Sequence, residues 1–152
     1  MSATRDTAVG IQPQQGFYPH RVVLAFPVGW SGKPTDAPCI LQHDLHYVDA
    51  RGHRHTAPRG TPTDGASIPR LFWRLAGHPF RSVVLPAAVI HDQYCVAAHR
   101  LKASGQEVAA RALRRMADSL FAEGCRWLGA GRVMSAAYYA GVRCGAATSG
   151  LL

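Results

Sequence analysis

The chain has 152 residues, of which 47% are apolar and 17% charged, so it has the length and composition of one folded domain rather than a disordered segment. No apolar run approaches the ~18 residues that a membrane-spanning helix needs, and residues 1–16 lack the apolar centre of a secretory signal peptide. The net charge of +8 suits an anionic partner, although many basic proteins bind nothing acidic. We therefore expect a single domain over residues 1–152 that is cytoplasmic as synthesised, with virion association or signal-independent export as alternatives.

The four cysteines, Cys39, Cys95, Cys125 and Cys144, are widely spaced and contain no C-x-x-C pair. Structural zinc sites usually draw cysteines from such pairs, and four cysteines are too few for a disulfide scaffold of this length. The spacing therefore predicts free thiols in a reducing compartment.

The N-terminal part reads as a flexible arm over residues 1–16, followed by a β-rich part over residues 17–62. The run RVVLAF (residues 21–26) predicts a short strand, and residues 39–48 show partial alternation of apolar and polar side chains. The sequence DARG (residues 49–52) is a turn signal, so we expect a hairpin there.

From Pro86 the pattern becomes helical, and Pro86 itself suits the first turn of a helix. Ser104 and Glu107 have the spacing of a capping box for a second helix, which Gly124 can end. The expected apolar stripe of that helix is Ala109, Ala112, Leu113, Met116, Ala117, Leu120 and Phe121. A third helix is expected over residues 132–144. The fold class predicted is α+β, mainly α, with an N-terminal β-hairpin and strand region and a three-helix core over residues 63–148.

Four residues form a candidate site in the helical half. His91 and Asp92 are adjacent on the first helix, and Asp118 on the next helix can meet them if the two helices are antiparallel. A histidine beside a carboxylate can act as general base toward water, with Asp118 fixing its tautomer. Asp92 points roughly 100° away around the helix and, with Asp64 and a loop carbonyl, offers the oxygen ligands that calcium prefers.

A purely structural interpretation of the same residues stays open. His-Asp dipeptides are common, and the chain contains a second one at His43 and Asp44. Asp118 could instead form a surface ion pair with Arg114 or Arg115, which would contribute under ~1 kcal/mol.

The runs TDGASIPRLFW (residues 63–73), PAAVIHDQYC (86–95) and ADSLF (117–121) resemble the phage and bacterial family known as domain of unknown function 1353. The resemblance covers about half of the chain, and the family carries no established activity. With SAAYYAGVRCG (residues 135–145), the same segments also resemble the helical core of prokaryotic phospholipases A₂. The order and approximate spacing agree over residues 63–145, which implies a three-helix, phospholipase A₂-like core.

The phospholipase resemblance implies a role for each matching residue. His91 would activate water and Asp118 would orient His91, while Asp64, the carbonyl of Gly65 and Asp92 would bind calcium. The implied activity is calcium-dependent hydrolysis of an acyl ester, with a phospholipid or an anionic membrane surface as the partner.

The chain departs from the phospholipase pattern at three positions. Ala66 and Ala88 stand where that family has two cysteines that form a disulfide, and Cys95 stands where it has a tyrosine that holds the partner aspartate. Tyr94 is displaced from that position by one residue. Paired replacement of the cysteines by a small residue is consistent with packing in a reducing compartment.

Three alternatives follow from the same sequence. The chain could be a catalytically silent structural or accessory protein of a phage or phage-like particle, with other particle proteins as partners. Zinc could bind a cluster of histidines in the β-rich part, although no supporting motif accompanies it; these are His43, His46, His53 and His55. Nucleic acid is not expected as a partner, because the arginines are scattered and no nucleic-acid-binding motif is present.

Overall fold

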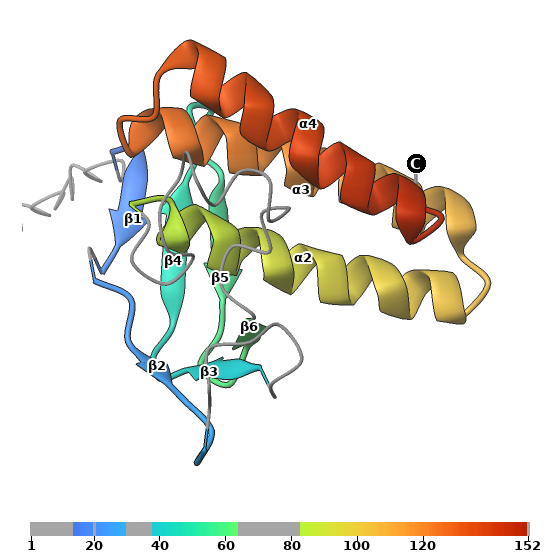
Figure 1. Ribbon diagram of the computed structural model, residues 1–152, viewed down its shortest axis with the longest axis horizontal. Coiled ribbons are helices and arrows are strands. Elements are labelled where there is room, and N and C mark those ends of the chain that lie inside the picture. Colours follow the sequence, from blue (N-terminus) through green and yellow to red (C-terminus); the bar gives the residue numbers. More distant parts are fainter. Residues whose placement is uncertain (1–13, 20, 30–37, 64–82, 152) are drawn as a thin grey trace, which may run out of the picture.

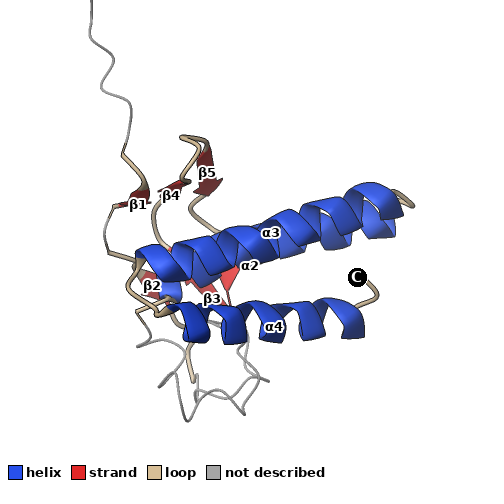
Figure 2. Ribbon diagram, turned by 90° about the horizontal axis from the view of Figure 1, so that it is seen from above, coloured by secondary structure: helices blue, strands red, loops and turns tan. Residues whose placement is uncertain are grey.

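The computed structural model describes residues 14–19, 21–29, 38–63 and 83–151. Small antiparallel sheets come first and three long helices follow, which confirms the predicted α+β class. The strands are β1 (Gly16–Tyr18), β2 (Leu24–Ala25), β3 (Cys39–Leu41), β4 (Leu45–Val48), β5 (Arg54–Ala57) and β6 (Pro62–Thr63). The helices are α2 (Leu85–Ala103), α3 (Glu107–Trp127) and α4 (Arg132–Thr148). The helices run alongside one another, and the strands gather near one end of them (Figures 1 and 2).

The strands form two three-stranded antiparallel sheets, with orders β1-β4-β5 and β2-β3-β6. The predicted turn after Val48 is confirmed: the Asp49 carboxylate accepts the backbone N–H groups of Arg51 and His53, and Gly52 adopts a φ of 82°. The segment 39–48, expected as one alternating unit, instead contributes β3 to one sheet and β4 to the other. The predicted strand over residues 21–26 is reduced to the two residues of β2.

The first helix begins as its sequence predicts. Pro86 is in the first turn of α2, where a residue without an N–H leaves no hydrogen bond unmade. The capping box predicted for α3 is wrong: α3 begins at Glu107 after Gln106, without a side-chain cap, and the Ser104 hydroxyl donates back to the Leu101 carbonyl.

Gly124 does not end α3, which continues to Trp127. It is buried inside the helix, where a Cβ would lie 3.0 Å from Cζ of Phe17 and 3.1 Å from Cβ of Ala87. The glycine therefore allows β1 and α2 to approach α3 closely.

The buried face of α3 differs from the predicted apolar stripe. Ala109, Ala112 and Met116 are exposed. The helix instead buries two charged side chains, Arg114 and Asp118, between its apolar contacts. The full set of buried α3 residues is Ala110, Arg114, Ala117, Asp118, Leu120, Phe121, Ala122, Gly124 and Cys125.

The main core lies where the β1-β4-β5 sheet meets α2 and α3. Phe17 stacks on Tyr47 with ring centroids 4.4 Å apart and meets the edge of Trp127. The Tyr47 hydroxyl and the Ala50 N–H both donate to Glu123 Oε1, which fixes the hairpin against α3.

The expected N-terminal arm, residues 1–16, is described only in its last residues, because residues 1–13 lie outside the described ranges. Gly16 already belongs to β1, and the Gln15 side chain donates to Tyr47 and Glu123. Within the described part of the chain, no helix has both the length and the hydropathy required to span a membrane.

Candidate functional site

Two of the predicted site residues meet between α2 and α3. His91 Nε2 lies 2.8 Å from Asp118 Oδ1, and the two side chains face each other from neighbouring helices. Asp118 is 0% exposed and His91 is 7% exposed. The ring of Phe121, a residue of the main apolar core, lies next to His91 with ring centroids 5.2 Å apart.

Asp118 is the centre of a buried ionic cluster. Arg114 Nε donates to Oδ1 and Arg143 Nη1 donates to Oδ2, each at 2.9 Å. Burial alone would raise the pKa of Asp118, but the hydrogen bonds from His91, Arg143 and Arg114 outweigh it and hold that pKa below its ordinary value. Asp118 is therefore an ionised carboxylate.

Two arginines, Arg114 and Arg143, bind Asp118, and the sequence indicated only the first of them. The sequence indicates Arg114 only as a surface partner of Asp118, but Arg114 is 7% exposed and its Nη2 also donates to the Val142 carbonyl. Arg143 was not identified. The spacing of Arg114 and Asp118, four residues apart on one helix, was the available signal for the first pair. No local signal marks Arg143, which comes from α4.

The ionised Asp118 determines the tautomer of His91. A carboxylate can only accept hydrogen bonds, so Nε2 of His91 carries the proton and Nδ1 is the nitrogen that can gain or lose one. Burial disfavours the charged imidazole, but Asp118, Asp92 and Cys95 together raise the pKa of His91 well above its ordinary value.

Asp92 lies beside the second ring nitrogen. Its Oδ1 is 3.8 Å from His91 Nδ1, and its Oδ2 accepts a hydrogen bond from the Thr63 hydroxyl at 2.5 Å. Asp64 and Gly65, the other predicted metal ligands, lie outside the described residues.

Cys95 lies one helical turn after His91. Its Sγ is 3.5 Å from Nδ1 and 3.6 Å from Nε2, and these nearly equal distances place the sulfur off the lone-pair axis of either nitrogen. All four cysteines are free thiols. The neighbouring Tyr94 does not support Asp118, since its hydroxyl is hydrogen-bonded to His55 Nδ1 at 2.8 Å.

A cavity of about 240 Å³ opens next to this site. Asp92, Cys95 and His99 line it from α2, and Thr63 lines it from β6. Asp92 and Cys95 both line this cavity and both lie next to His91 Nδ1, so the cavity adjoins the surroundings of the imidazole.

The four histidines of the β-rich part do not all converge on one point. His46 is hydrogen-bonded to Thr56 and His43 to the carbonyl of Asp44, whereas His53 and His55 both contact Asp49. Among the described residues, no group of three or more His, Cys, Asp or Glu side chains is placed to hold a metal ion. The zinc interpretation of these histidines is therefore not supported.

Residues 39–142 match the family described as "Protein of unknown function (DUF1353)". The chain belongs to this family. The DUF1353 match extends from β3 into α4 and contains His91, Asp92 and Asp118. The DUF1353 description assigns no activity to these residues.

Two curated relatives share a shorter segment, and both come from Sinorhizobium fredii (strain NBRC 101917 / NGR234). "Uncharacterized protein y4jT" is 46% identical over 55 residues, which cover 36% of this chain and 16% of the relative. "Uncharacterized protein y4iH" is 45% identical over 56 residues, or 37% of this chain and 23% of the relative. The chain thus spans less than a quarter of either relative. No solved structure matches, and none of the comparisons identifies a phospholipase A₂.

Proposed function

We propose that this protein is a calcium-dependent acyl-ester hydrolase that acts on phospholipids. The observation that carries the proposal is the buried contact between His91 Nε2 and the ionised Asp118, which leaves Nδ1 as the proton-accepting atom. In the reaction, Nδ1 removes a proton from water, the hydroxide attacks the ester carbonyl carbon, and the imidazolium returns the proton to the departing alcohol oxygen.

A bound calcium ion would have two effects that the His91–Asp118 pair cannot have by itself. Asp92 Oδ1 lies 3.8 Å from His91 Nδ1, and this carboxylate would hold calcium together with Asp64 and the Gly65 carbonyl, the hard oxygen ligands that the phospholipase resemblance implies. Bound calcium would polarise the ester carbonyl. Its charge would also offset the contribution of Asp92 to the raised pKa of His91, which favours the neutral imidazole that acts as base.

The surroundings suit a lipid ester. The cavity beside Asp92 and Cys95 offers a route for the ester group toward His91. The net charge of +8 favours binding to anionic lipid surfaces. We place the protein in the cytoplasm after synthesis, with action on an anionic membrane face there or after export by a signal-independent route.

The test is release of fatty acid from anionic phospholipid vesicles, with calcium or with a chelator of it. The wild type should hydrolyse lipid only with calcium, and His91→Asn should lose at least about 100-fold, the usual contribution of general-base catalysis. His43→Asn changes the other His-Asp dipeptide and should retain full activity. Equal rates in the wild type and His91→Asn, or no hydrolysis by either, would overturn the proposal.

A catalytically silent structural or accessory protein of a phage-like particle is the second candidate. The observation in its favour is that Arg114, Arg143 and His91 saturate the Asp118 carboxylate inside the core, as a structural ion cluster would. Such a protein would keep its fold and assembly partners when His91 is replaced by asparagine and would show no hydrolysis. The lipid assay therefore separates the two candidates.

A further inference from the structure

A second hollow, which we call the α3–α4 groove, lies between helices α3 and α4. It has a volume of about 560 Å³, within the range of small-molecule sites. Its lining residues are Ser119, Ala122 and Arg126 from α3 and Arg132, Ser135, Ala136 and Tyr139 from α4. None of these residues lines the cavity beside Asp92, so the two hollows are separate.

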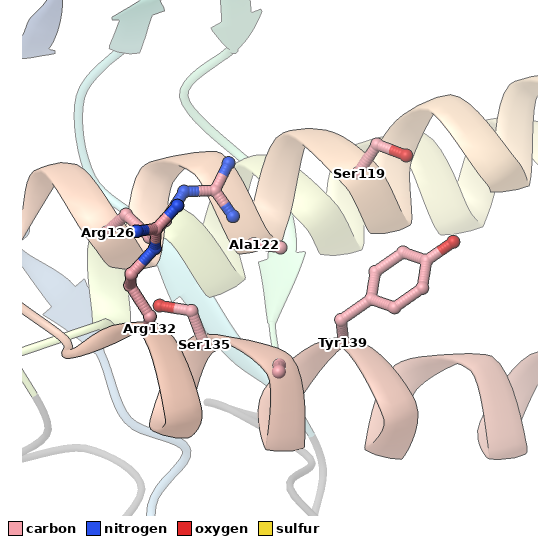
Figure 3. Close-up of a pocket in the computed structure, with 7 residues that line it drawn as sticks. Ser119, Ala122, Arg126, Arg132, Ser135 and Tyr139 are labelled. Atoms are coloured by element: carbon pink, nitrogen blue, oxygen red, sulfur yellow. The ribbon is translucent and has the colours of Figure 1, made fainter.

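Two arginines occupy one end of the α3–α4 groove. Figure 3 shows Arg126 reaching in from α3 and Arg132 from α4, with Ser135 beside them. Tyr139 and Ser119 lie farther along the same groove (Figure 3). Small side chains at Ala122 and Ser135 leave the space between the helices open.

No carboxylate among the described residues neutralises these arginines. The salt bridges of the described chain leave out both Arg126 and Arg132. The α4 sequence contains no acidic residue. On α3, Asp118 is occupied by the buried cluster, and Glu123 accepts hydrogen bonds from the hairpin.

The arginines are also not required to complete the helix ends. The last carbonyls of α3, at Gly124, Cys125 and Arg126, accept backbone N–H groups from the following loop. Arg132 is the first residue of α4, so its guanidinium adds to the positive end of that helix dipole. Two guanidinium groups and a helix N-terminus converge on one hollow, with hydroxyl donors farther along it.

We propose that the α3–α4 groove binds a phosphate group, carried either by a small soluble ligand or by a lipid headgroup. Guanidinium groups pair with phosphate oxygens through two parallel hydrogen bonds, and phosphate carries more negative charge than a carboxylate. Tyr139 is 38% exposed and lines the groove, where its hydroxyl can donate to the same ligand. This site goes beyond the proposed hydrolase and does not depend on it.

The test uses inorganic phosphate and vesicles as separate probes. Calorimetric titration measures the binding of inorganic phosphate at constant ionic strength, with chloride as the control anion. Vesicle sedimentation compares binding to phosphatidylcholine alone with binding to phosphatidylcholine plus phosphatidic acid. The double variant Arg126→Gln/Arg132→Gln removes the groove charges. Arg54→Gln/Arg100→Gln removes two exposed arginines elsewhere and matches its net charge.

We expect the groove variant to bind at least about tenfold more weakly than the wild type, and the matched control to remain within about twofold. A groove-specific loss with inorganic phosphate identifies a phosphate group as sufficient, whereas a groove-specific loss with vesicles alone identifies a lipid headgroup. Absence of binding to both probes, or equal losses in the two double variants, would overturn the proposal. Urea unfolding of each variant verifies that the fold is retained.

Discussion

At the scale of single residues, Asp118 determines the properties of the candidate site. It is fully buried, and every strong contact it makes is with a positively charged or protonated group. The same contacts that ionise Asp118 also fix the proton of His91 on Nε2. The proposed catalytic geometry and the stability of the core therefore depend on the same carboxylate.

Replacement of Asp118 by asparagine should destabilise the fold by about 3–5 kcal/mol, because it leaves Arg114 and Arg143 without their buried counter-ion. Urea unfolding measures the change. Glu107→Gln breaks the exposed pair with Arg111 and should cost no more than about 0.5 kcal/mol. Similar losses in the two variants would show that the Asp118 cluster is not buried in solution.

The pKa values of His91 and Asp118 set a pH window of maximal stability. The pKa of His91 is raised above 6.5 in the fold, so its contribution is complete below pH 6.5 and is lost as pH rises through the folded value. The pKa of Asp118 is lowered below 3.8, so its contribution is complete above pH 3.8 and is lost as pH falls through the folded value. Unfolding free energy should therefore be highest between pH 3.8 and 6.5.

Urea titrations across pH measure this window, and His91→Gln should flatten the decline on its alkaline side. His43→Gln should leave that decline unchanged. An alkaline decline of equal size in the wild type and His91→Gln would contradict the assignment of the shift to His91.

At the scale of elements, α3 shows where sequence patterns succeed and fail. Its length and position follow from periodicity, but its buried face does not, because a hydrophobic template does not count charged residues that pair in the core. Arg114 and Asp118 are buried because they form an ion pair with each other, whereas Ala112 and Met116 are exposed. The capping box failed because the Ser104 hydroxyl bonds to the preceding helix instead.

Two helical glycines should respond oppositely to alanine. Gly124→Ala should destabilise the fold by about 1 kcal/mol or more: its Cβ would crowd Phe17, which is fixed between Tyr47 and Trp127 and cannot shift away. Gly145→Ala meets only ordinary contact with Arg114 and should stabilise by up to ~1 kcal/mol through helix propensity. Urea unfolding measures both, and stabilisation by Gly124→Ala would contradict the packing of β1 against α3.

At the scale of the whole molecule, the sequence predicts the fold class and the order of strands and helices, but not the pairing of the strands. Strands of two to four residues carry little periodicity, so segment 39–48 could not be divided between two sheets in advance. His91 and Asp118 could be placed together from helix order and family resemblance. Arg143 could not, because nothing local specifies how α4 aligns with α3.

The proposed hydrolase requires a calcium ion bound next to His91 through Asp92. Calorimetric titration of the protein with calcium measures this binding, with Asp92→Asn as the site variant and Asp44→Asn as the control from the second His-Asp dipeptide. We predict that the wild type and Asp44→Asn bind calcium and that Asp92→Asn does not. Absence of binding to the wild type at millimolar calcium, or equal binding by all three proteins, would rule out a calcium site at Asp92.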